Sequence, residues 1–152
     1  MKERSVIHST FVIERTYPAK PERVFAAFSD PNRKRRWYGE GEEAKLVFHE
    51  LDFRVGRTER TRRRLKPGWE FTGETIYRDI VPNQRIVFSY NMSVGDTVIS
   101  TSQATVELLP SETGTELIFT EQGAFYEGSD GPKMREEGWS LLLDRLGRSV
   151  AN

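Results

Sequence analysis

Cysteine is missing from this chain of 152 residues. Its absence excludes disulfides, thiolate metal ligands and cysteine nucleophiles. The first ten residues are charged and lack the apolar core of a signal peptide. No stretch approaches the roughly 20 consecutive apolar residues that a membrane-spanning helix needs. Together these absences predict a cytoplasmic protein with no membrane span.

An excess of charge of one sign is also lacking, because 23 Lys and Arg residues balance 23 Asp and Glu residues. Nothing global therefore attracts the chain to nucleic acid or anionic lipid. Two local basic runs are the exceptions, at residues 33–36 and 57–66. Binding of phosphate or RNA is one interpretation of these runs. The favoured one is a solvated strand edge, where Lys and Arg discourage pairing with another sheet, so we expect no nucleic-acid partner.

Candidate catalytic residues are few. The two histidines, His8 and His49, show no metal-binding spacing, so a surface or hydrogen-bonded structural role is favoured for each. The chain contains no nucleophile elbow, P-loop or dinucleotide-binding fingerprint. We therefore expect no metal site and no cofactor, and hydrolase, kinase and dinucleotide-dependent activities are disfavoured.

What the chain does have is large apolar side chains: nine Phe, five Tyr and three Trp. They suffice for one folded domain over residues 1–152. Alternation predicts a strand over 8–17, with Phe11 and Ile13 on one face. Apolar spacing predicts short helices over 21–28 and 31–37, and Asp30 before Pro31 is a helix cap.

From residue 44 onward the apolar period becomes two. It predicts an antiparallel meander of strands over 46–54, 57–65, 69–80, 85–92, 97–109 and 115–121. Residues 132–150 return to helical spacing, with an apolar stripe of Trp139, Leu143, Leu146 and Val150 that Met134 and Leu142 widen. Such a helix needs the sheet to cover its apolar face. The predicted fold is therefore α+β: a seven-stranded curved antiparallel sheet that grips a long C-terminal helix around an apolar cavity, with two short helices between the first two strands.

Several segments resemble the heat shock protein 90 ATPase activator-like family. Residues 15–31 together with Trp37 resemble its N-terminal signature, and residues 73–88 are similar to its central hairpin. Residues 105–108, 114–117, 120–125 and 138–146 look like one bacterial branch of the family. The resemblance covers nearly the whole chain. One departure is Gly56-Arg57, where the family often has a Gly-Gly turn.

This family belongs to the START-like, or SRPBCC, superfamily, which also includes the birch pollen allergens. The resemblance implies the helix-grip fold and a cavity between the sheet and the helix. Other members use this cavity for lipids, hormones and polyketides. It also implies a stress-response role with a chaperone partner. The eukaryotic activators carry a further N-terminal domain that contributes to chaperone binding, and the single domain expected here has no room for one.

Aromatic residues are the strongest indication of a ligand site. Tyr and Trp combine an apolar body with one polar group, which suits an amphipathic ligand. For any single residue, core filling remains the favoured interpretation. Residues 121–125 are expected to lead from the last strand to the helix and to form the cavity mouth. The predicted cavity residues are Trp37, Tyr77, Phe88, Tyr90, Met92, Phe119, Phe125, Gly138, Trp139, Leu142, Leu143 and Leu146.

Two carboxylates, Glu74 and Glu121, are candidate polar groups of that cavity. Burial of either would raise its pKa and make it a candidate general acid or base, although a solvent-facing position is favoured for each. The adjacent pairs Glu42-Glu43 and Glu136-Glu137 diverge on a strand or helix, so neither makes a shared site.

Three functional hypotheses follow from these patterns. The first is non-enzymatic binding of a small hydrophobic or amphipathic ligand between sheet and helix. The second is an enzyme of the cyclase or dehydratase type that uses a buried Glu or Tyr. The third is a protein-interaction module with a chaperone partner, and an exposed strand edge would also permit a homodimer.

Overall fold

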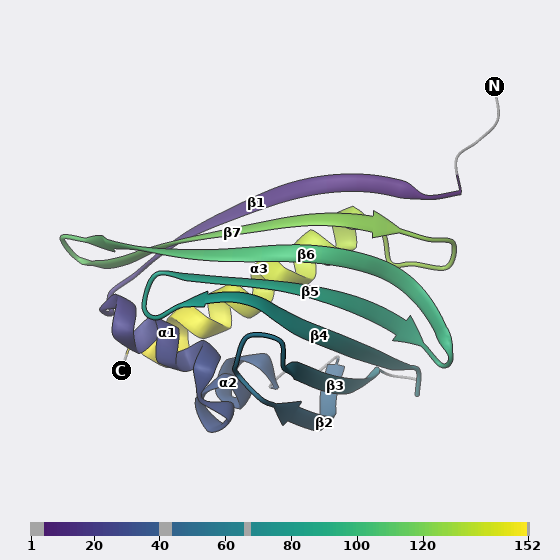
Figure 1. The fold of residues 1–152 in the computed structure, drawn as a ribbon, viewed down its shortest axis with the longest axis horizontal. Helices are drawn as coiled ribbons and strands as arrows, with labels where there is room; N and C mark the ends of the chain where they lie inside the picture. The colour runs from purple at the N-terminus through teal and green to yellow at the C-terminus, as the bar shows by residue number, and fades with distance from the viewer. Residues whose placement is uncertain (1–4, 40–43, 66–67, 152) are drawn as a thin grey trace.

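The computed structural model describes residues 5–39, 44–65 and 68–151. Within these residues, a seven-stranded antiparallel sheet bends around the long helix α3, and α1 and α2 lie at one end (Figure 1). This confirms the predicted helix-grip fold. In chain order the elements are β1 (Ile7–Tyr17), α1 (Pro21–Ser29), α2 (Pro31–Tyr38), β2 (Ala44–Leu51), β3 (Thr58–Leu65), β4 (Glu70–Val81), β5 (Arg85–Val94), β6 (Thr97–Ser111), β7 (Gly114–Phe125) and α3 (Pro132–Val150).

The strand order is β1-β7-β6-β5-β4-β3-β2, with every neighbouring pair antiparallel. Strands β2 to β7 follow one another in the sheet as they do in the chain, and β1 pairs with β7. Both basic runs were predicted to lie on a strand edge, and neither does. Residues 33–36 lie on the helix α2, and residues 58–65 form β3, which is not an edge strand because β2 pairs with it. That prediction is wrong on this point.

The first three elements follow directly from local sequence. On β1 the side chains of Phe11, Ile13 and Tyr17 are buried, whereas Val12 between them is exposed, as the alternation predicts. Pro21 begins α1, where its missing N–H is harmless. Asp30 caps α2, since its carboxylate accepts hydrogen bonds from the backbone N–H groups of Asn32 and Arg33 at 2.9 and 3.3 Å.

Strand β7 continues four residues beyond its predicted end and reaches Phe125. The prediction that residues 121–125 lead away from the strand is wrong, because this stretch pairs with β1 on one side and β6 on the other. Strand pairing overrides the weak β-propensity of Gly123 and Ala124. Gly123 is also needed for close packing: a Cβ atom there would lie 2.8 Å from Ser102 Oγ.

Helix α3 has the predicted bounds, Pro132–Val150. Trp139, Leu143, Leu146 and Val150 are buried, which confirms the apolar stripe. Met134 is 63% exposed, because it lies five residues, or roughly 140° around the helix, from Trp139. No helix in the described part of the chain is long and apolar enough to cross a membrane.

Candidate functional site

A cavity of about 620 Å³ lies between α3 and the inner face of the sheet. Ligand sites in proteins commonly measure about 300–1,000 Å³. The cavity opens along α3, where its lining residues Met134, Gly138 and Leu141 are exposed to solvent. Its lining consists of Lys34, Tyr38, Glu59, Thr61, Arg63, Leu65, Phe71, Gly73, Thr75, Phe88, Tyr90, Met92, Asp130, Met134, Arg135, Gly138, Trp139, Leu141, Leu142 and Arg145.

Half of the predicted cavity residues line this cavity. They are Phe88, Tyr90, Met92, Gly138, Trp139 and Leu142. The others are buried in the core and are not part of the lining: Trp37, Tyr77, Phe119, Phe125, Leu143 and Leu146. Trp37, for example, fixes α1 to α2, because its indole Nε1–H donates to the Ala27 carbonyl at 2.9 Å. That the lining residues bind a ligand stays a prediction.

Gly138 marks open space in the wall of the cavity. A Cβ atom added there would meet no atom within 4 Å. Glycine inside a helix costs about 1 kcal/mol relative to alanine. Close packing does not require Gly138, so it leaves room at the cavity mouth.

Tyr90 is the centre of a largely buried polar group that joins β5, β6, β7 and α3. It is here called the Tyr90 cluster and consists of Tyr90, Ser100, Ser102, Glu121, Asp130, Arg135 and Trp139. The Tyr90 hydroxyl donates to Glu121 Oε1 at 2.7 Å. It accepts from Arg135 Nη1 at 3.0 Å and from Trp139 Nε1 at 3.2 Å. A phenol has one donor and two acceptor positions, so all of its hydrogen-bonding capacity is used by the protein.

Glu121 lies on the inner face and is fully buried. Burial raises the pKa of Glu121, and hydrogen bonds from Tyr90 and Ser102 together with the charge of Arg135 oppose that shift. Its two oxygens accept from Tyr90 and from Ser102 Oγ, the latter at 3.0 Å. Glu121 is not among the residues that line the cavity.

The raised pKa of Glu121 predicts how stability depends on pH. A carboxyl whose pKa is higher in the fold contributes stability below its ordinary value of 4.5, and this contribution is lost as the pH rises through the folded value. Glu121→Gln removes that titration and keeps the side-chain shape. We expect the stability of the variant relative to the wild type to increase as the pH rises above 4.5, measured by urea unfolding. A difference that does not change with pH, or that changes equally in the exposed-site variant Glu137→Gln, would contradict this.

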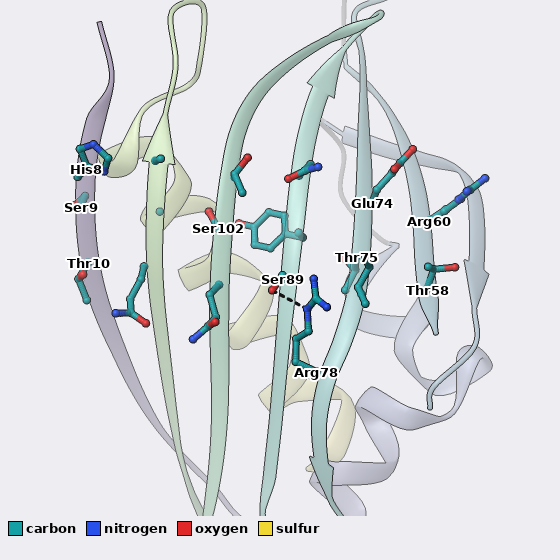
Figure 2. Close-up of a pocket in the computed structure, with 18 residues that line it drawn as sticks. His8, Ser9, Thr10, Thr58, Arg60, Glu74, Thr75, Arg78, Ser89 and Ser102 are labelled. Carbon is teal, nitrogen blue, oxygen red and sulfur yellow. Dashed lines mark hydrogen bonds between the residues drawn. The ribbon is translucent and has the colours of Figure 1, made fainter. Parts of the chain in front are cut away.

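Glu74 lies on the opposite, outer face of β4. Together with His8 and Arg60, it lines a separate hollow over the outer face of the sheet (Figure 2). The hollow has a volume of about 790 Å³, and most of its lining residues are polar. Its neighbour Gly73 lines the inner cavity, and its other neighbour Thr75 contributes to both hollows. Because side chains alternate along a strand, Glu74 cannot contact a ligand in the inner cavity.

A second buried polar group was missed by the sequence reasoning. This Glu59 cluster consists of Lys34, His49, Glu59 and Tyr77. Glu59 Oε1 accepts from Lys34 Nζ and from the Tyr77 hydroxyl, each at 2.7 Å. Glu59 Oε2 lies 2.7 Å from His49 Nε2, and Arg35 Nε–H donates to His49 Nδ1 at 3.0 Å. The imidazole proton therefore lies on Nε2, where it is donated to Glu59.

Glu59 is ionised in this environment. Burial by itself would raise the pKa of Glu59, but the charge of Lys34 and the hydrogen bonds from His49, Lys34 and Tyr77 outweigh it and lower the pKa to about 2. Burial and the neighbouring carboxylate raise the pKa of Tyr77 well above its ordinary value. Lys34 and Glu59 both line the cavity, so a buried ion pair forms part of its wall.

Two local signals point to this cluster. Lys34 was assigned to a solvated basic run, but it is buried, because it lies three residues before the buried Trp37 on the same helix face. Alternation along β3 places Glu59, Thr61 and Arg63 on the inner face. Among the described residues, no group of three or more His, Cys, Asp or Glu side chains is placed to hold a metal ion. The pair Glu42-Glu43 lies outside the described residues.

Comparison with known proteins supports the resemblance seen in the sequence. Residues 18–151 match the model of a family described as activator of Hsp90 ATPase homolog 1-like protein. The crystal structure of the Mll3558 protein from Rhizobium loti is 50% identical, with a TM-score of 0.86 over 97% of this chain and 100% of that one. An uncharacterized protein from Rhizobium leguminosarum is 39% identical, with a TM-score of 0.91 over 98% of both chains.

A more distant structure shares the fold alone. The solution structure of an AHSA1-like protein from Aeromonas hydrophila is 21% identical, with a TM-score of 0.64 over 93% of this chain and 92% of that one. A search of the curated proteins finds no match.

Proposed function

Because the chain belongs to the activator of Hsp90 ATPase homolog 1-like family, we propose that it binds a small hydrophobic or amphipathic molecule in the cavity between its sheet and α3. Proteins with this fold commonly bind ligands. The proposed role is binding without chemical conversion of the ligand.

The observation that carries this proposal is the cavity of about 620 Å³. The core around it is filled, because Trp37, Phe119 and Leu143 have no exposed surface. The lining combines apolar surface from Phe71, Phe88 and other residues with charged groups on the same walls. An apolar pocket with a few placed polar groups suits an amphipathic ligand.

An enzyme of the cyclase or dehydratase type is less well supported. Such an enzyme needs a carboxyl or phenol that is available to exchange a proton with the ligand. The Tyr90 hydroxyl has no unused donor or acceptor position, and Glu121 is not in the lining. Glu59 reaches the cavity as a carboxylate that already has three partners. A role as a chaperone partner rests on the family description alone.

Gly138 offers a direct test of the proposal. We expect the wild type to bind the neutral apolar dye Nile red, and Gly138→Leu to weaken binding about tenfold, which is 1.4 kcal/mol. The added side chain enters open space that the ligand would otherwise fill, and each ligand methylene denied burial costs about 0.8 kcal/mol. Dye fluorescence titration measures the affinity.

The matched control is Glu137→Leu, which adds the same side chain one position away on the exposed side of α3. It should bind the dye as the wild type does. Equal affinity in all three proteins, or no binding in any, would contradict the proposal. Native mass spectrometry of the protein purified without detergent provides a second readout, since a retained small molecule would identify the ligand class.

A further inference from the structure

The charged residues of the cavity wall are not balanced. Four lining residues are cationic, namely Lys34, Arg63, Arg135 and Arg145. Two lining residues are anionic, namely Glu59 and Asp130, so the lining carries a net charge of two positive. How these charges pair decides where an anion would bind.

Arg135 is neutralised by the protein itself. Its Nε and Nη2 atoms donate to the two carboxylate oxygens of Asp130 at 2.9 and 2.8 Å. Arg135 also donates from Nη2 to Ser100 Oγ at 2.9 Å and to Met92 Sδ at 3.4 Å, and from Nη1 to the Tyr90 hydroxyl at 3.0 Å. Glu121 Oε2 lies a further 3.8 Å from Nη1. This end of the cavity therefore holds no excess positive charge.

Lys34 is neutralised in the same way. Its ammonium lies 2.7 Å from Glu59 Oε1 and faces the ring of Tyr38 at 4.7 Å. The ammonium and the carboxylate are both almost completely buried, so little solvent screening weakens their attraction. Of the four cationic lining residues, Arg63 and Arg145 are the two that no lining carboxylate neutralises.

Arg63 and Arg145 reach the cavity from different walls, Arg63 from β3 and Arg145 from α3, and both are half-buried. The Arg63 guanidinium lies 4.4 Å from the centre of the Tyr38 ring, and its Nη2 donates to the Tyr38 carbonyl. These contacts fix the orientation of the planar Arg63 guanidinium. Arg145 lies ten residues, roughly 15 Å along the helix, from the neutralised Arg135. Among the described residues of the lining, no third carboxylate is present to balance this pair.

We propose that the ligand is an amphipathic anion whose carboxylate or phosphate head is bound by Arg63 and Arg145. Its apolar body would then lie along Phe71, Phe88 and Leu142. Guanidinium groups suit this role because their planar array of donors matches the oxygens of a carboxylate or phosphate. This inference rests on the proposed function and adds the chemistry of the head group to it.

The test compares probes of equal chain length that differ only in the head group: decanoate, decyl phosphate, decanol and decylamine. Each is titrated against the complex of the protein with Nile red, whose neutral charge avoids a bias toward anions. We expect at least one of the two anions to bind about tenfold more tightly than decanol, which corresponds to 1.4 kcal/mol. The tighter of the two identifies the head group as carboxylate or phosphate.

Variants assign this preference to the two arginines. Methionine keeps much of the apolar stem of arginine and removes its charge. The double variant Arg63→Met/Arg145→Met should bind the anions no more tightly than decanol, while its affinity for decanol stays that of the wild type. The single variant Arg145→Met should lose part of the preference and serves if the double variant does not fold. Arg148→Met, which removes an exposed charge outside the lining, should keep the full preference.

The outcomes separate this inference from the proposed function. If decanol or decylamine binds as tightly as the anions, or if the anion preference survives in the double variant, the head-group assignment is wrong and the binding cavity stands. If neither Nile red nor any probe binds the wild type, both proposals are wrong.

Discussion

Replacing Lys34 with methionine is expected to lower the free energy of unfolding by about 3–5 kcal/mol at neutral pH. The substitution leaves Glu59 only 3% exposed and without its cation. Removing one partner of a buried ion pair costs more than the pair contributes, because the remaining charge is still desolvated. Urea unfolding followed by circular dichroism measures the loss.

The pH dependence of this loss distinguishes charge from packing. In the wild type the pKa of Glu59 falls from 4.5 to about 2 on folding, so its contribution to stability is present above pH 4.5 and is lost as the pH falls toward 2. Without Lys34, burial raises the pKa of Glu59, so the variant loses stability as the pH rises. The difference between the two proteins should therefore be largest near pH 7 and should shrink as the pH falls toward about 2.

Arg36→Met is the matched control for this prediction. It removes a cation from the same basic run, but Arg36 is exposed, so the cost should stay within about 0.5 kcal/mol. If Arg36→Met cost as much as Lys34→Met, or if the deficit of Lys34→Met were the same at every pH, Lys34 would not act through the charge of Glu59.

The contrast between Lys34 and α3 shows what the sequence could and could not predict. The bounds of α3 and its buried stripe follow from spacing within one segment, which is a local property. The partner of Lys34 is 25 residues away on β3, and nothing in a basic run indicates which of its members meets a carboxylate. The sheet register decides that pairing. It places Glu59 opposite Thr75, beside the inward-facing Tyr77.

The burial of Glu121 could have been predicted from the sequence. It lies two residues from Phe119 on the same strand, so alternation places both on one face, and Phe119 is fully buried. The sequence could not predict the partners of Glu121, because Arg135 comes from α3 and the Tyr90 hydroxyl is 31 residues away on β5. The cavity was predicted as a feature of the fold. The half of its predicted residues that do not line it were assigned by apolarity alone, which does not separate core positions from cavity walls.

Arg135→Met is expected to produce a loss comparable to that of Lys34→Met, about 3–5 kcal/mol. Arg135 is 4% exposed and joins the first turns of α3 to β5 and to Asp130. Its removal leaves Glu121 and Asp130 without their shared cation. Tyr90→Phe should cost less, about 1–3 kcal/mol, because it removes one hydroxyl and leaves the ion pairs in place. The double variant Tyr90→Phe/Arg135→Met should lose less free energy of unfolding than the sum of the two single losses, since both residues belong to one network.

Although Arg135→Met is expected to lower stability strongly, we expect it to leave the preference for anionic ligands unchanged. Because the donors of Arg135 are taken by Asp130, Ser100 and Tyr90, an anionic ligand has little access to its charge. The variant should therefore keep the preference for decanoate or decyl phosphate over decanol wherever it remains folded. Arg63→Met/Arg145→Met should show the reverse, a small change in stability and a lost preference. If Arg135→Met removed the anion preference in folded protein, the head group would lie at the Tyr90 cluster, at the opposite end of the cavity from where the charge balance places it.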